Sequence, residues 1–155
     1  MNNINDFLNE WNWIRGLTIK FIESIPEDKL TFYPSKNFGS LGTQLRHIVT
    51  VQECYLNGFE KGRIDFSKKR KDKTIESSKK KLLEYAKLQD ERLKKIVSQF
   101  SKKDLQKIIK WKVWEPLPNP SISQCFVYMI EHESYHQGIL QLCADLAGFK
   151  TIRFF

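Results

Sequence analysis

The sequence is poor in cysteine and has no long apolar run, and these shortages exclude whole classes of protein. Its three cysteines, Cys54, Cys125 and Cys143, have no CxxC spacing, so we expect reduced thiols in the core rather than a disulfide framework. The longest apolar run, residues 125–130, has six residues, whereas a membrane-spanning helix needs about 20. No basic segment leads into an apolar stretch at the N-terminus, so no secretory signal is expected. We therefore predict a cytoplasmic protein without a membrane span.

The length and composition are those of a globular protein. Hydrophobic residues make up 41% of the chain and charged residues 28%, a balance typical of globular rather than disordered chains. A chain of 155 residues is long enough to bury a hydrophobic core and has the usual size of one domain. We expect residues 1–155 to form a single domain.

Positive charge is concentrated in residues 68–81, which we call the basic segment. It holds eight basic residues and two acidic ones, so six of the eight net positive charges of the chain lie there. A solvated linker that runs into a helix start explains such a segment without any partner. The alternative is binding of nucleic acid or another polyanion, although no aromatic residue that could stack on bases is interleaved before Tyr85.

Helical periodicity dominates the rest of the chain. Pro26 ends the first helical pattern, and Ser40 is placed to cap the second. Residues 121–124, Ser-Ile-Ser-Gln, are a capping box that starts the last helix, and Gly148 is a natural stop for it. Residues 107–114 alternate like a short strand. Apolar residues recur at three- and four-residue steps in four segments, at about 4–25, 41–59, 74–100 and 121–147.

Four long helices without comparable strand content predict an all-α fold, a four-helix bundle. The connections around residues 60–73 and 101–120 are too long for simple hairpins between neighbouring helices. At least one crossover is therefore expected, with a long connection before the last helix. The final residues, 149–155, are apolar and basic, and we expect them to pack on the body of the protein or on a neighbouring subunit.

Histidine is as scarce as cysteine, and two of the three histidines, His132 and His136, stand four residues apart. On a helix this spacing puts both imidazoles on one face, as a divalent metal needs from two ligands of one helix. Burying a polar ring without a partner costs about 1–3 kcal/mol, so two buried rings need a common explanation. Metal coordination supplies one, and two hydrogen-bonded core histidines are the alternative. His132 and His136 both lie on one seam of the last helix that we expect to face the interior. The seam consists of Cys125, Met129, His132, His136, Ile139, Cys143 and Leu146.

The remaining histidine, His47, is ambiguous on periodicity alone. At 100° per residue, it lies about 120° from the centre of the apolar stripe of the second helix. It shares this flank with Gln44, Val51 and Cys54. The flank could turn toward the last helix, which would make His47 a third ligand, or it could leave His47 at the surface.

Residues 132–136, His-Glu-Ser-Tyr-His, also match the H-E-x-x-H pattern of zinc peptidases, in which the glutamate is the general base. The extended form of that motif needs a glycine three residues after the second histidine and another histidine three residues further on. This chain has Ile139 and Leu142 at those places. No strand that could align a peptide substrate is expected nearby, so a peptidase is disfavoured.

Two longer motifs contain the histidines. Residues 41–48, Leu-Gly-Thr-Gln-Leu-Arg-His-Ile, and residues 131–140, Glu-His-Glu-Ser-Tyr-His-Gln-Gly-Ile-Leu, resemble motifs of the DinB-like superfamily, the damage-inducible group that also includes YfiT-type proteins. The resemblance extends over nearly the whole chain in helix order and spacing. It implies an up-down-down-up four-helix bundle with one divalent metal ion held by His47, His132 and His136.

The activities that this resemblance implies are varied. They include thiol-dependent S-transfer with bacillithiol or mycothiol, thiol-dependent isomerisation and metal-dependent hydrolysis. The resemblance and the apolar C-terminal residues also favour a homodimer. The basic segment matches no role in the family.

Three imidazoles with open coordination positions are typical of a catalytic rather than a structural metal site. Zinc or nickel suits all-nitrogen ligation, and iron and manganese are alternatives. Glu133 lies on the flank of the ligand face, where it could act as a base, orient the ligands or form an exposed salt bridge. Three further residues could support the ligands in the same way: Gln44, Glu131 and Gln137.

We therefore predict a metal-dependent transferase or hydrolase that acts on a small molecule such as a low-molecular-weight thiol. One alternative is a polyanion-binding or nucleic-acid-binding module that uses residues 68–81. The other is a non-catalytic bundle in which the metal only ties helices together.

Overall fold

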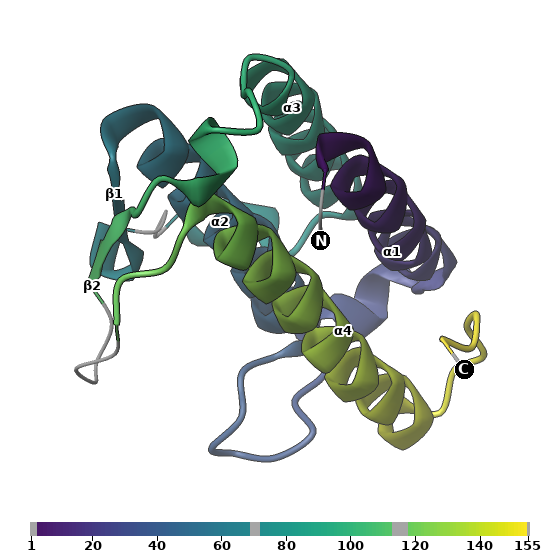
Figure 1. The fold of residues 1–155 in the computed structure, drawn as a ribbon. Coiled ribbons are helices and arrows are strands. Elements are labelled where there is room, and N and C mark those ends of the chain that lie inside the picture. The colour runs from purple at the N-terminus through teal and green to yellow at the C-terminus, as the bar shows by residue number, and fades with distance from the viewer. Residues whose placement is uncertain (1–2, 69–71, 113–117, 155) are drawn as a thin grey trace.

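The computed structural model describes residues 3–68, 72–112 and 118–154. Within them the chain forms four long helices, and the predicted mostly helical fold is confirmed (Figure 1). Two short strands pair in parallel beside α2. The helices are α1 (Ile4–Ser24), α2 (Leu41–Lys61), α3 (Lys79–Val97) and α4 (Ile122–Ala147), and the strands are β1 (Arg63–Asp65) and β2 (Lys110–Lys112).

α2 and α4 begin and end where the local sequence predicts. The Ser40 hydroxyl accepts a backbone N–H at the start of α2, and Ser121 and Gln124 form the reciprocal capping box of α4. α2 and α4 end at Gly62 and Gly148, whose φ angles of 70° and 72° lie in the left-handed region that favours glycine.

Two segments differ from the prediction. α3 begins at Lys79 rather than near residue 74, because the Ser78 side chain caps it there and Lys73–Ile75 forms a separate 3-10 turn. The predicted strand at 107–114 is shorter, with β2 covering only Lys110–Lys112, and its residues 113 and 114 lie outside the described residues.

Each of α1 and α2 packs against both α3 and α4 (Figure 1). The C-terminal residues return to this body, since the Phe154 ring stacks on Phe21 with 5.2 Å between centroids. The prediction that this tail packs on the protein itself is thereby confirmed up to residue 154, and Phe155 lies outside the described residues. None of the described helices is long and apolar enough to cross a membrane.

The interior contains two hydrophobic clusters. One includes Phe7 and Phe126, whose rings stack with centroids 4.0 Å apart, and the other includes Phe21, Leu45 and Leu140. Near the boundary of the two clusters, buried or half-buried polar residues of all four helices are linked to one another by side-chain hydrogen bonds and ion pairs. We call these residues the polar layer: Arg15 and Thr18 of α1, Gln52 of α2, Asp90 of α3, and Glu133 and Gln137 of α4.

The three cysteines are buried and none forms a disulfide, as expected for core thiols.

Candidate metal centre

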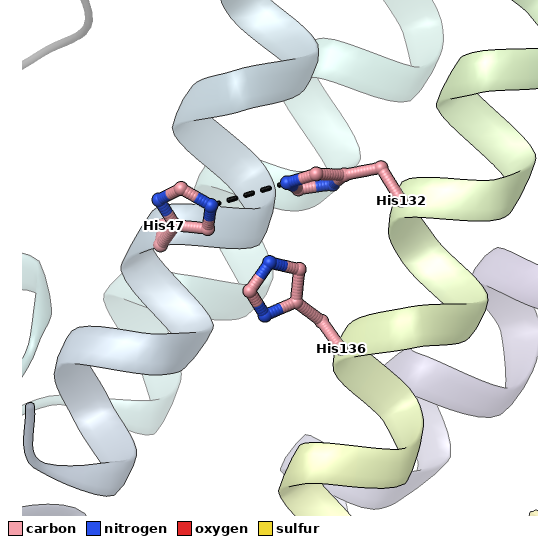
Figure 2. A group of neighbouring side chains, drawn as sticks. All are labelled: His47, His132 and His136. Atoms are coloured by element: carbon pink, nitrogen blue, oxygen red, sulfur yellow. Dashed lines mark hydrogen bonds between the residues drawn. The ribbon is translucent and has the colours of Figure 1, made fainter. Parts of the chain in front are cut away.

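Three histidines from two helices meet at the side of the polar layer. His132 and His136 lie one turn apart on α4 and point toward His47 on the neighbouring α2 (Figure 2). The centroid of the His47 ring lies 5.1 Å from that of the His132 ring and 4.7 Å from that of the His136 ring. The flank of α2 that carries His47 therefore turns toward the last helix, which periodicity alone left open.

The nitrogen atoms are spaced as ligands of one metal ion would be. One candidate ligand atom from each histidine lies within 4.8 Å of the other two, and His47 Nε2 and His132 Nε2 are 3.1 Å apart. With metal–nitrogen bonds of about 2.0–2.1 Å, two ligands of a tetrahedral ion lie about 3.3 Å apart. The residues present therefore fit a divalent metal ion.

This histidine cluster lies at the edge of the interior. His136 is 8% exposed, whereas His47 and His132 are half-buried. The ring of the exposed Tyr135 lies edge-on to His136 with 5.2 Å between centroids. A metal ion held by three side chains at such an edge would keep coordination positions for a ligand from solvent, unlike a closed site with four protein ligands.

The buried face of α4 is rotated relative to the seam that the sequence predicts. Met129 and Cys143 are buried as expected, but Ile139 is half-buried and Leu146 is 56% exposed. Because α4 packs against α1 as well as α2, its buried face extends around to the α1 side, and the histidines lie at one border of it. The stripe that is buried there contains Glu133, Gln137, Leu140 and Ala144.

Glu133 is buried against α1. It is 1% exposed, its Oε2 pairs with the Arg15 guanidinium at 3.2 Å, and its Oε1 accepts a hydrogen bond from the Thr18 hydroxyl at 2.5 Å. Burial raises the pKa of Glu133 above its usual range, while the Arg15 charge and the Thr18 hydrogen bond oppose that rise. The alternative of an exposed salt bridge is therefore wrong. To act as a base, Glu133 would have to leave contacts that engage both of its oxygens.

Hydrogen bonds extend the polar layer to all four helices. Arg15 donates to Gln52 Oε1 at 2.9 Å, and Gln52 Nε2 in turn donates to Asp90 Oδ1 at 2.9 Å. Trp11 Nε1 donates to the same oxygen at 3.1 Å, and the Arg15 guanidinium lies over the Trp11 ring. Arg15 and Asp90 are absent from the sequence-based candidates. The signal for Arg15 is its position in line with Trp11 and Thr18 on an otherwise apolar stripe.

The other candidates for supporting the ligands have different environments. Gln137 is 3% exposed and donates to the Ile14 carbonyl at 2.8 Å and to the Thr18 hydroxyl at 3.0 Å. Gln44 is half-buried and Glu131 is exposed. Of these three, Gln137 has contacts that belong to the polar layer.

The basic segment lies on another part of the chain. Residues 69–71 lie outside the described residues, and Lys73, Lys80 and Lys81 are exposed. Lys79 Nζ donates to the Glu23 carbonyl at 2.8 Å. Binding of nucleic acid or another polyanion by this segment stays an untested alternative.

Comparison with known proteins agrees with this architecture. The model of the DinB family matches residues 1–154. The chain belongs to the DinB family. The resemblance drawn from the two histidine motifs is thereby confirmed.

Two solved DinB-like proteins have the same fold. One, from Bacillus subtilis, is 21% identical with a TM-score of 0.75, and the match covers 96% of each chain. The other, from Bacillus cereus, is 23% identical with a TM-score of 0.78, and the match covers 99% of each chain. At these identities the likeness shows the fold alone. No curated protein matches the chain.

Proposed function

We propose that His47, His132 and His136 hold one divalent metal ion and that this DinB-family chain is a metal-dependent enzyme acting on a small molecule. The observation that carries the proposal is the convergence of three imidazole nitrogens within 4.8 Å at the border of the interior. Zinc or nickel suits three nitrogen ligands, and iron and manganese are alternatives. When bound, such an ion would supply Lewis-acid activation of water or of a thiol.

Thiol S-transfer and hydrolysis both suit a three-histidine site with open positions. In either reaction the chain's own part is to hold the ion with neutral imidazoles and to admit the small molecule beside the half-buried His47 and His132. A low-molecular-weight thiol remains the predicted co-substrate. The homodimer, the cytoplasmic location and the single domain remain predictions too.

The peptidase alternative loses further support from the geometry. In H-E-x-x-H peptidases the glutamate acts on the metal-bound side of the helix, whereas the oxygens of Glu133 contact Arg15 and Thr18 on α1. The third histidine also comes from a helix upstream of the motif, not downstream. We therefore assign Glu133 a role in orienting the ligands rather than that of a base.

We further infer the up-down-down-up order of the helices that the family resemblance implies. Contacts advance in the same direction along α1 and α4 and along α2 and α3, but in opposite directions along α2 and α4. The contacts that support this order are Phe7 with Phe126 and Thr18 with Gln137, Gln52 with Asp90 and Asn57 with Arg92, and Phe59 with Phe126 and His47 with His136.

Elemental analysis of the purified protein tests the metal site. We expect about one equivalent of a divalent metal per chain, and its loss in His47→Ala, His132→Ala and His136→Ala. Glu53→Ala is the matched control, because Glu53 is also half-buried on α2 but lies about 120° around the helix from His47. Absence of bound metal at neutral pH, or its retention by all three histidine variants, would contradict the proposal.

A second measurement separates an enzyme from a metal-stapled bundle. The metal-loaded protein is screened for thiol transfer with a low-molecular-weight thiol and a reactive electrophile, and for ester hydrolysis. Turnover that disappears in the three histidine variants supports the enzyme. A large loss of thermal stability on chelation without any turnover supports the staple instead.

A further inference from the structure

Each metal-binding histidine of α4 is followed directly by a buried polar residue. Glu133 follows His132, and Gln137 follows His136. Neighbouring residues of a helix project about 100° apart, so the two members of each pair face different helices. The histidines face α2, and Glu133 and Gln137 contact α1.

The two polar residues meet on one side chain of α1. The Thr18 hydroxyl donates to Glu133 Oε1 at 2.5 Å and accepts from Gln137 Nε2 at 3.0 Å. Gln137 also donates to the Ile14 carbonyl at 2.8 Å, and Arg15 pairs with Glu133 at 3.2 Å. All of these polar side chains are at most 3% exposed. Their hydrogen bonds are therefore made away from water, where a lost partner is costly.

Two such contacts one turn apart restrain the rotation of α4 about its own axis. A side-chain nitrogen at about 6 Å from a helix axis moves by about 1 Å when the helix turns by about 10°. Metal–ligand distances vary by only about 0.2 Å. A small rotation would therefore carry His132 and His136 out of register with His47.

Little free space separates the histidines from the polar layer. His132, Glu133 and Gln52 line the same cavity of about 10 Å³, which has room for no more than about one water molecule. The polar layer and the histidine cluster therefore border the same small cavity.

We propose that Arg15 and Thr18 of α1 are positioning residues for the metal centre: they act through Glu133 and Gln137 to set the rotation of α4 and with it the distance of its two histidines from His47. The inference rests on the proposed metal site. A polar layer that only holds the bundle together would change stability without changing coordination.

Binding of Co²⁺ to the metal-free protein tests the inference, because its visible spectrum reports coordination geometry and a competing chelator gives its affinity. Thr18→Val and Gln137→Met remove the shared contacts with little change in size, and Thr18→Ser keeps the hydroxyl. Gln89→Met is the matched control, because Gln89 is 3% exposed but belongs to α3. We expect Thr18→Val and Gln137→Met to weaken Co²⁺ binding at least about tenfold and to change its spectrum, and Thr18→Ser and Gln89→Met to change neither.

Wild-type affinity and spectrum in both Thr18→Val and Gln137→Met would overturn the inference. An equal loss in Gln89→Met would overturn it as well, since any buried polar change would then suffice. Circular dichroism of the metal-free variants checks their folding, and Thr18→Ala replaces Thr18→Val if that variant does not fold. If the proposed metal site itself is wrong, the wild-type protein binds no Co²⁺. This outcome differs from failure of the positioning role, in which the wild type and the variants bind Co²⁺ alike.

Discussion

Replacing Arg15 with methionine tests how the polar layer is held inside the bundle. Arg15 is 3% exposed, and its guanidinium provides the charge that pairs with Glu133 at 3.2 Å. In Arg15→Met, the Glu133 carboxylate keeps its Thr18 hydrogen bond but loses that counter-charge. Removing one partner of a buried ion pair costs about 3–5 kcal/mol, because the other charge is left uncompensated. For a chain of this length, the Tm should fall by about 10 °C.

Removing the other partner should cost less. In Glu133→Gln, Arg15 keeps Asp90 at 3.6 Å and Gln52 at 2.9 Å, and the new amide still offers an oxygen to Thr18. The double variant should therefore be more stable than the sum of the two single changes predicts, by about 0.5–3 kcal/mol.

The cost of Arg15→Met should also depend on pH. Burial already raises the pKa of Glu133 above its unfolded value, and Arg15 is the larger of the two influences that oppose the rise. A group with a raised pKa contributes stability at pH values below its unfolded pKa, and this contribution is lost as the pH rises through the folded pKa. Without Arg15 the folded pKa is higher still, so the loss continues to higher pH. Arg15→Met should be most destabilising, relative to wild type, at neutral and alkaline pH.

Urea denaturation of the metal-free proteins at about pH 5 and about pH 8 measures all three effects, with the free energy of unfolding taken from the transition. The metal is removed so that ligation does not contribute. Equal costs of Arg15→Met and Glu133→Gln with an additive double variant would refute the buried ion pair. A cost of Arg15→Met that does not change between the two pH values would refute the assignment of its origin to the Glu133 charge.

Three further outcomes are expected from other parts of the structure. A Cβ at Gly42 would lie 1.9 Å from the backbone oxygen of Glu76, so Gly42→Ala should lower the free energy of unfolding, measured by urea denaturation, by about 1–3 kcal/mol or more. A Cβ at Gly16 would have nothing within 4 Å, so Gly16→Ala should raise the free energy of unfolding by up to about 1 kcal/mol. The reverse order of the two variants would contradict this packing. Burial raises the pKa of the Cys125 thiol to about 12, so iodoacetamide should label it only after unfolding, and rapid labelling of the folded protein, seen by mass spectrometry, would count against this burial. With free metal about 1,000-fold above its Kd, chelation should lower the free energy of unfolding of the wild type by about 4 kcal/mol and reduce its Tm, but it should leave the Tm of His47→Ala unchanged. An equal Tm shift in both proteins would place the metal elsewhere.

The ends of α2 and α4 follow from chemistry within a few residues, which is why the sequence predicts them well. A capping hydroxyl at Ser40, a capping box at Ser121 and glycines in the left-handed conformation at Gly62 and Gly148 need no distant partner. The β1 strand depends on one, because Arg63 pairs with Lys110, which lies beyond α3 in the long connection before α4. Local patterns contain no information on such a pairing.

The candidate site divides in the same way. The spacing of His132 and His136 is local and predicts two ligands on one helix. The position of His47 depends on how α2 turns toward α4, so periodicity left both a ligand and a surface residue possible, and only the family resemblance favoured the ligand. The contacts of Glu133 could not be predicted from the sequence for the same reason. Periodicity places the residue on a flank of α4, but the packing of the whole bundle decides which helix covers that flank.

The polar layer is hard to explain as a device for stability. Replacing a buried ion pair with well-packed apolar residues is often neutral or stabilising by about 1–4 kcal/mol, and a leucine at each inward position would join the two hydrophobic clusters into one. What distinguishes this layer is its register on α4, where Glu133 and Gln137 come directly after the two histidines. The same contacts one turn earlier or later on α4 would tie α1 to α4 equally well, but they would not restrain the histidines themselves. We infer that the layer is placed for the orientation of these ligands rather than for the stability of the bundle.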